Sequence, residues 1–345
     1  MAVIDFHNHY YPPAYLAALR SGGSNVRVTA DAEGNPLLHY PGDFNVAVRG
    51  HRDIAYRAAV LAEQGVDVQV LTLTTPGTHV ESPATAARLA SLVNDAMAGA
   101  VGDGRGRFAA LATLPLNDPA AAVREFERAH GQLGLPGAML FSNVNGVALA
   151  DRRFWALYEA ANERGAVLHI HPTNPASIDA LADFWLMPLV GFLFDTTIAA
   201  AQLVFSGVVE RFPRIRWVLS HLGGAIPYLA ERLDRGFHAF PECRAHIERP
   251  PSEYLARLYY DTVNFDPAAL ALAVAFAGAD RLLAGSDYPH QIGSIPAMLG
   301  SIHGLQLAAA DRAKVLGGNA ARLLGLPGAG EGAASGARPV ASSGG

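Results

Sequence analysis

Eight short apolar segments recur along the chain, and segments with helical spacing lie between them. Most of the eight are continuous apolar runs, which are typical of strands in a parallel sheet that is buried on both faces. This repeated alternation of strand and helix predicts an α/β fold, the (β/α)8 TIM barrel. The predicted strands cover residues 3–7, 67–73, 108–114, 137–141, 166–171, 215–220, 258–263 and 282–286.

Local signals mark the ends of several predicted helices. Asp118 suits the cap and Pro119 the first turn of a helix that begins near residue 117. Gly165 follows another helical segment and is a typical C-terminal signal. The predicted helices cover residues 51–64, 117–130, 152–164, 224–235, 266–277 and 311–324.

Two segments do not belong to a minimal barrel. Residues 10–50 separate the first strand from its helix, and the Glu-Gly-Asn turn at 33–35 predicts a hairpin. We therefore expect a small β insertion over the barrel mouth. Residues 327–345 are rich in Gly, Ala, Ser and Pro, so we expect a disordered tail. A single barrel domain over residues 1–326 is the predicted organisation.

Composition restricts the functional classes. The chain has 345 residues, of which 50% are hydrophobic, so it can bury a large core. A net charge of −5 without a basic stripe gives no indication of nucleic-acid binding. The single cysteine, Cys243, excludes an intrachain disulfide. We find no signal peptide and no uninterrupted apolar stretch near ~18 residues, and we expect a cytoplasmic protein with no membrane partner.

Histidines and one aspartate lie where predicted strands end. His7 and His9 end the first strand, His171 ends the fifth, His221 follows the sixth, and Asp287 follows the eighth. Each residue alone has a structural alternative, such as a hydrogen-bonded core histidine or a turn-forming aspartate. Together they meet at the carboxyl-terminal mouth, where TIM barrels carry their chemistry. Imidazole and carboxylate ligands in this pattern predict a zinc-like metal centre.

Lysine usage limits the number of metal ions. Many barrel hydrolases bridge two metals with a carboxylated lysine after strand 4, but here Ser142 and Asn143 follow that strand. The only lysine, Lys314, lies beyond strand 8. The sequence therefore predicts one divalent metal with an open position for water or substrate, as in catalytic sites.

Longer motifs resemble the amidohydrolase superfamily, and within it the branch of aminocarboxymuconate-semialdehyde decarboxylase and its relatives. The motifs extend from the first strand to the last: HNH at 7–9, HP at 171–172, FWLMPLVG at 184–191, DTT at 195–197, FPRIRWVLSHLGG at 212–224 and GSDYPH at 285–290. One departure concerns the substrate. The decarboxylase usually has a tryptophan after the HP motif, whereas Thr173 and Asn174 follow here.

The resemblance implies a role for each motif residue in the metal centre. It implies that His221 acts as acid or base beside the metal, and Asp287 is expected to carry a proton as well as bind the metal. The implied metal ligands are His7, His9, His171 and Asp287. Relatives that act on hydroxybenzoates often have Glu-x-His at the first pair. The His-x-His of this chain favours Zn²⁺, with Mn²⁺ as the alternative.

Substrate-binding residues follow partly from the same resemblance. Trp185 matches an aromatic residue that packs on the substrate, and Arg49 lies near the family's position for a carboxylate-binding arginine. Arg232 matches an arginine that reaches the site of a neighbouring subunit, which implies a homodimer. From its position after Asp287, His290 is expected to line the mouth.

These features predict non-oxidative decarboxylation of an unsaturated or aromatic carboxylic acid, without an organic cofactor. Two alternatives remain open at this stage. The same metal ligands could serve a hydrolase of a lactone, ester, amide or C–C bond, or a barrel that binds metal without catalysis. His169 shares a strand face with His171 and is expected to support it. The remaining histidines at 51, 79 and 303 are expected in loops or at the surface.

Overall fold

The computed structural model describes residues 2–175 and 181–326, and the predicted tail at 327–345 lies outside these residues. All eight predicted barrel strands are present, and their positions agree with the prediction within a few residues. They are β1 (Ile4–His9), β5 (Val68–Thr72), β6 (Phe108–Ala110), β7 (Gly137–Phe141), β10 (Val167–His171), β11 (Arg216–Leu219), β12 (Tyr259–Asp261) and β13 (Leu282–Leu283).

Parallel pairing arranges these strands in two sheets, β1-β5-β6 and β13-β12-β11-β10-β7. Backbone contacts join the sheets at both pairs of edges. Ala112 bridges to Ala138 beside β7, and the Phe6 N–H donates to the Ala284 carbonyl at 2.7 Å beside β13. These contacts close the ring of strands, and the predicted TIM barrel is confirmed.

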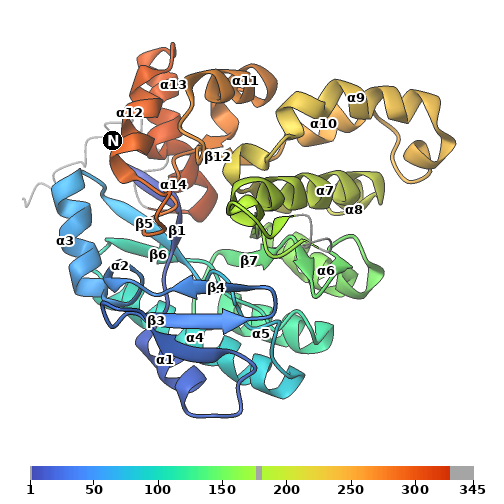
Figure 1. The fold of residues 1–345 in the computed structure, drawn as a ribbon. Helices are drawn as coiled ribbons and strands as arrows, with labels where there is room; N and C mark the ends of the chain where they lie inside the picture. Colours follow the sequence, from blue (N-terminus) through green and yellow to red (C-terminus); the bar gives the residue numbers. More distant parts are fainter. Residues whose placement is uncertain (1, 176–180, 327–345) are drawn as a thin grey trace, which may run out of the picture.

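Helices surround the barrel in the expected alternation (Figure 1). The predicted cap at Asp118 is present, because its side chain accepts a hydrogen bond from the Ala121 N–H at 3.0 Å. Among the main helices, α4, α7 and α12 were not predicted, since their segments are rich in small and apolar residues and lack a clear polar stripe. The main helices are α3 (Ile54–Gln64), α4 (Pro83–Asp103), α5 (Pro119–Gly131), α6 (Trp155–Arg164), α7 (Phe192–Phe205), α9 (Ile226–Ala239), α11 (Pro267–Ala277) and α12 (Ile295–Gly304).

Shorter elements complete the fold. The predicted helix at 311–324 consists of consecutive α-helical, π-helical and α-helical segments. The last segment, at residues 319–324, packs its leucines against the interior residues of the barrel strands. These elements are α1 (Pro13–Arg20), α2 (Arg49–Arg52), η3 (Met187–Gly191), α8 (Val208–Arg211), η4 (His221–Gly223), α10 (Pro251–Leu255), α13 (Ala309–Ala313), η7 (Lys314–Gly318) and α14 (Asn319–Leu324).

An antiparallel sheet lies within residues 10–50, where the sequence predicts the β insertion. It consists of β2 (Arg27–Ala30), β3 (Pro36–Tyr40) and β4 (Asp43–Val46) and is drawn in blue in Figure 1. Asn45 donates to the Thr75 carbonyl at 2.8 Å, and Asn174 donates to the Pro41 carbonyl at 2.8 Å. The sheet is therefore held against loops that follow β5 and β10, at the carboxyl-terminal side of the barrel.

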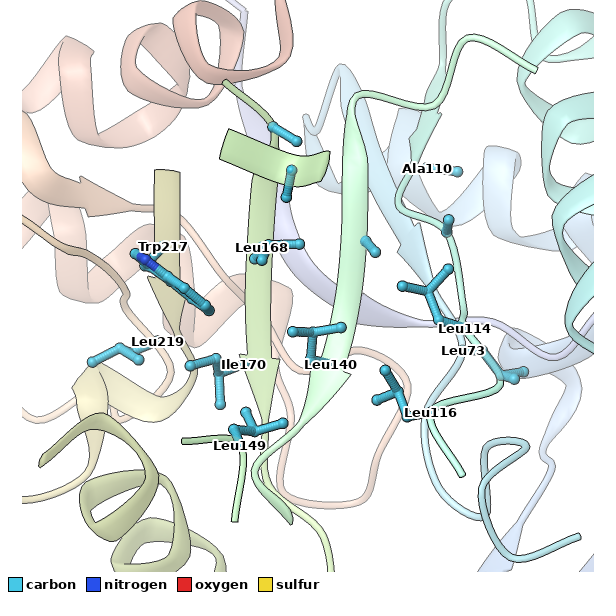
Figure 2. Packing of buried hydrophobic residues seen from close by; sticks show 14 of the residues in the cluster. Leu73, Ala110, Leu114, Leu116, Leu140, Leu149, Leu168, Ile170, Trp217 and Leu219 are labelled. Carbon is cyan, nitrogen blue, oxygen red and sulfur yellow. The ribbon is translucent and has the colours of Figure 1, made fainter. Parts of the chain in front are cut away.

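Alternating strand residues divide the core into an outer and an inner layer. Figure 2 shows the outer layer, in which Leu140, Leu168, Ile170 and Trp217 pack in one cluster with other buried residues. A separate cluster fills the barrel interior. It consists of inward-facing residues from seven of the strands together with Leu323 of α14. This interior layer supports the polar mouth from below.

The continuous helical segment Met187–Phe205 is the one described helix that has the length and hydropathy of a membrane span, with a mean hydropathy of 1.5. It differs from a lipid-facing helix in one respect. Asp195 within it is 8% exposed and accepts hydrogen bonds from Ser142 and Asn143 after β7. This buried carboxylate attaches the helix to the barrel, so we assign the segment to the fold rather than to a membrane.

Candidate metal centre and active site

Strand β1 brings its two histidines to the same point. His7 and His9 are both fully buried, and their Nε2 atoms lie 3.1 Å apart. The pairing of β1 with β5 shifts register between Asp5 and Asn8, which changes the face that the end of the strand presents. Because of this shift, Phe6 and the two β1 histidines can all face the barrel interior. The Phe6 ring lies against His169, and His7 and His9 lie nearer the carboxyl-terminal mouth.

Two further side chains complete the predicted set of four. Asp287 Oδ1 lies 3.1 Å from His9 Nε2 and 3.5 Å from His7 Nε2. His171, at the end of β10, contributes one ring nitrogen, and the donor atoms of all four residues lie within 4.8 Å of one another. All four residues are buried. The structure therefore brings the sequence-predicted metal ligands together.

Hydrogen bonds orient the donor atoms toward a common point. His7 Nδ1 lies 2.5 Å from Asp261 Oδ2, and His171 Nδ1 donates to the Pro172 carbonyl at 2.8 Å. Each contact assigns the ring proton to Nδ1 and leaves a lone pair on Nε2. The Nε2 atoms of His7 and His171 and the carboxylate of Asp287 are therefore three electron-pair donors that lie close together, with no proton to share among them. A divalent cation satisfies this arrangement, so these residues fit a bound metal.

Strained backbone holds two residues of this centre. Asp287 and His221 have positive φ angles of 58° and 55°. This left-handed conformation costs roughly 1–2 kcal/mol for a residue with a Cβ. Hydrogen bonds compensate for it: the Asp287 N–H donates to the His7 carbonyl, and the His221 N–H donates to Asp261 Oδ1, each at 2.9 Å. The strain aims both side chains into the mouth.

Asp261, at the end of β12, is a functional residue that the sequence analysis did not identify. It is fully buried and contacts His7 through Oδ2, while Oδ1 accepts the backbone N–H groups of His221 and Val263. The carboxylate of Asp261 thus orients the metal ligand His7 and also holds the loop that carries His221, the predicted acid or base. A weak signal existed in the sequence, because Asp261 is a carboxylate within the seventh predicted strand, residues 258–263, whose other residues are mostly apolar.

Burial and neighbouring charge determine the protonation of the centre. Burial alone would lower the pKa of His7, but the adjacent carboxylate of Asp261 outweighs this effect and raises it. Burial would raise the pKa of Asp261, and the charge of His7 reverses that effect and lowers it. Burial, followed by repulsion from His171, holds the pKa of His9 well below its usual value. His9 is therefore neutral at pH 7, as a metal ligand must be.

His221 lies beside the four-residue set without belonging to it. Its Nε2 is 4.0 Å from Asp287 Oδ2, and its Nδ1 is buried with no hydrogen-bond partner among the described residues. Burial lowers the pKa of His221, so the ring is neutral at pH 7 and can accept a proton. His169 supports the centre from below: its Nε2 lies 2.9 Å from Ser220 Oγ and 3.9 Å from Asp261 Oδ2.

Residues 4–326 match the sequence model of the amidohydrolase family. This match covers nearly all of the barrel and includes all four candidate metal ligands. The chain belongs to the amidohydrolase family. The resemblance inferred from its motifs is confirmed.

Several members of the family are similar to this chain over most of its length. A 2-amino-3-carboxymuconate-6-semialdehyde decarboxylase of Dictyostelium discoideum is 32% identical over 78% of this chain and 76% of its own. The crystal structure of 5-carboxyvanillate decarboxylase from Sphingomonas paucimobilis has a TM-score of 0.81 at 30% identity, covering 94% of this chain and 99% of its own.

A third relative was solved with a metal. The dihydroxybenzoic acid decarboxylase of Polaromonas sp. JS666 contains manganese and the inhibitor 2-nitroresorcinol. It has a TM-score of 0.78 at 25% identity and covers 94% of this chain and 97% of its own. The named relatives are thus decarboxylases of this amidohydrolase family.

The predicted substrate-binding residues lie at different distances from the amidohydrolase metal centre. The ring of His290 is 4.8 Å from that of His9, so it lines the mouth next to the ligands. Trp185 is 62% exposed and lies against Phe44 of the β insertion. Arg232 is exposed on α9. The side chain of Arg49 is 64% exposed, and its Nε pairs with Asp53 Oδ2 at 2.9 Å.

Two histidines expected in loops or at the surface are buried instead. His51 is 1% exposed and its ring lies 5.0 Å from that of His290, and His79 is 4% exposed against Phe141. His79 lies in the loop after β5, as expected, although its ring is buried. The expectation was wrong for His51, which lies in the short helix α2 with its ring 5.2 Å from that of Tyr11. No described residue is hydrogen-bonded to either nitrogen of His51. His51 therefore adds an uncommitted polar group to the wall beside His290.

Proposed function

We propose that this chain is a metal-dependent decarboxylase of an aromatic or unsaturated carboxylic acid, of the hydroxybenzoate or carboxymuconate type. The observation that carries the proposal is the buried set of four metal donors at the barrel mouth, with His221 beside it. The activities of the amidohydrolase-family relatives support the reaction type. The reaction replaces a carboxylate by a proton and releases CO₂, so it needs no redox partner.

The metal we propose is a single Zn²⁺ ion bound by His7, His9, His171 and Asp287. Three imidazoles and one carboxylate are a typical zinc donor set. Mn²⁺ is the alternative, and the Polaromonas relative was solved with that metal. A bound divalent cation supplies positive charge that orients an anionic substrate and stabilises negative charge developing on it. Lys314 takes no part, since it pairs with Asp280 and Asp311, each at 2.9 Å.

The residues around the centre perform the proton transfers. We assign His221 to accept a proton from a substrate hydroxyl or a water, which its lowered pKa permits. His221 then returns this proton to Asp287, whose Oδ2 lies 4.0 Å from His221 Nε2, and Asp287 delivers it to the carbon that loses CO₂, so that both groups end in their starting protonation states. His290 and His51 lie on the adjacent wall, and Trp185 lies at the outer rim, where each can contact the substrate.

Release of CO₂ tests this proposal. Zinc-loaded and manganese-loaded protein would be incubated separately with 2,6-dihydroxybenzoate, 6-methylsalicylate, 5-carboxyvanillate and aminocarboxymuconate semialdehyde. We expect CO₂ from at least one of them, and loss of release after chelation of the metal. Hydrolysis of lactones or amides by the same preparation, with no CO₂ from any acid, would contradict the decarboxylase and support a hydrolase.

We further propose a cytoplasmic homodimer in which Arg232 contacts the substrate carboxylate of the partner's site. Exposed apolar side chains on η3 and α7 support a subunit interface: Leu189 is 49%, Phe194 52% and Ile198 52% exposed. Sedimentation velocity tests the dimer. The variant Phe194→Glu/Ile198→Glu should sediment as a monomer, while the control Leu272→Glu, on α11, should not. A wild-type monomer would remove Arg232 from the site.

A further inference from the structure

A second concave site lies at the opposite end of the barrel from the metal centre. It has a volume of about 250 Å³ and is formed by the amino-terminal ends of β11 and β12, the residue before β13, and parts of α8 and α10. Along β11 it lies roughly 15 Å from the loop of His221, at about 3.3 Å per strand residue. The proposed decarboxylation does not use this site.

Four arginines line this site, which we call the arginine pocket: Arg216, Arg249, Arg257 and Arg281. Within the described ranges, Arg216, Arg257 and Arg281 have no carboxylate within 4.0 Å, and Arg249 reaches only Glu253, at 3.9 Å. Such a concentration of positive charge is unusual in a chain with a net charge of −5. Placing like charges together is unfavourable unless an anion joins them.

One acidic residue, Glu210, also lines the pocket, but hydrogen bonds within the protein engage it. Its Oε2 accepts the hydroxyl of Tyr254 and the backbone N–H of Glu248, the latter at 3.3 Å. Glu210 therefore links α8 to α10 and the segment before it through hydrogen bonds. Its single charge does not balance four guanidinium groups.

Aromatic rings and a backbone contact hold three of the four guanidinium groups in place. Arg281 lies over the ring of Tyr259 at 4.8 Å, and Arg249 lies over that of Tyr254 at 5.0 Å. Arg216 donates from Nε to the Gly165 carbonyl at 2.7 Å, which leaves its terminal nitrogens for another acceptor. Because the groups are oriented beforehand, a ligand loses less entropy in recruiting them.

An independent observation points to a missing acceptor. Trp217 lines the pocket and is 2% exposed, and its indole N–H has no hydrogen-bond partner among the described residues. A buried donor without an acceptor costs roughly 1–3 kcal/mol. An anionic oxygen in the pocket would supply the acceptor and also balance the arginines.

We propose that the arginine pocket binds a phosphate group, either as inorganic phosphate or as part of a small phosphate monoester. The planar guanidinium fork pairs with two phosphate oxygens at once, and several forks can share one group. The site is separate from the metal centre, so occupancy does not require decarboxylation.

Titration of the ¹⁵N-labelled full-length, metal-loaded protein tests this site. Inorganic phosphate and glycerol 3-phosphate would be added separately at constant ionic strength while the indole N–H signals are followed. The three tryptophans give three signals, which Trp155→Phe and Trp185→Phe assign. We expect the Trp217 signal to shift to saturation with at least one of the two. The ligand that saturates it identifies the source of the phosphate group.

Variants separate this site from binding at the metal. Arg257→Gln/Arg281→Gln should raise the Kd at least tenfold, while Arg124→Gln, an exposed arginine on α5, should leave it unchanged. Arg257→Gln alone, at an exposed residue without a described partner, repeats the test with little risk to folding. The absence of a saturable Trp217 shift with both ligands, or equal affinity in wild type and double variant, would overturn the proposal.

Discussion

Asp261 connects the metal centre to the barrel at the scale of a single residue. It lies 2.5 Å from His7 Nδ1 and fixes the ring so that Nε2 faces the other donors. Carboxylates in this position typically contribute 10–100-fold to metal affinity. We predict that Asp261→Asn weakens Zn²⁺ binding by about this factor, measured by competition with a chromophoric chelator.

The control is Asp103→Asn, which makes the same change at the exposed end of α4. It should bind Zn²⁺ as the wild type does. Equal affinity in the Asp261 and Asp103 variants would mean that Asp261 supports the fold and not the metal.

His221 offers a test of catalysis that is separate from metal binding. It lies outside the four-donor set, so its loss should leave the metal content unchanged. We predict that His221→Asn lowers kcat for CO₂ release by about 10²–10⁴-fold, the usual contribution of a general acid or base. Asparagine tolerates the positive φ of 55° and so keeps the loop in place.

Metal analysis of the same variant provides the decisive comparison. A His221→Asn protein that purifies without metal would identify His221 as a ligand instead of an acid/base. His303→Asn, at an exposed position on α12, should change neither kcat nor metal content.

At the scale of elements, the pairing of β7 with β10 positions His171. A Cβ on Gly137 would overlap the backbone oxygen of Val167 on the neighbouring strand. We predict that Gly137→Ala lowers the free energy of unfolding by more than about 3 kcal/mol, at the upper end for overpacking. Urea denaturation followed by circular dichroism measures this change.

Gly99 in α4 provides the matched substitution. A Cβ there meets no atom within 4 Å. Since alanine is the better helix former, Gly99→Ala should raise the free energy of unfolding by about 0.5–1 kcal/mol. If the two Gly→Ala variants had the same stability, the close contact of β7 and β10 would be wrong.

The whole molecule should lose stability on mild acidification because of buried histidines. Burial lowers the pKa of His79 to about 4 and that of His169 to about 3, whereas an unfolded histidine titrates near 6.5. Between these values the unfolded chain binds more protons, so the free energy of unfolding falls as the pH falls below about 6.5. At pH 5.5 each histidine accounts for a loss of about 1.4 kcal/mol.

Asp5 acts in the opposite direction over part of this range. Its burial raises its pKa to about 6, so the folded protein takes up a proton there and regains some stability on acidification. Urea unfolding at pH 7.0 and 5.5 measures the sum. His79→Gln should reduce the pH dependence by about 1.4 kcal/mol, and the exposed His303→Gln should not. An unchanged slope in His79→Gln would show that His79 is protonated in the folded state.

Strand positions and donor types were determined by the sequence alone. Apolar runs of strand length, interrupted by helical spacing, are local patterns, and they identified all eight barrel strands. Parallel strands in a barrel end at one mouth. The positions of His7, His9, His171 and Asp287 therefore implied their convergence before any distance was known.

Contacts between distant segments were decided only by the tertiary structure. Asp261 meets His7 across 254 residues, and no local pattern specifies that pair. The pairing of Arg49 with Asp53, the burial of His51 and His79, and the arginine pocket depend on how loops and helices pack on the barrel. Side chains at strand ends are directed by the strand itself, whereas those on loops and helices are directed by their neighbours in space.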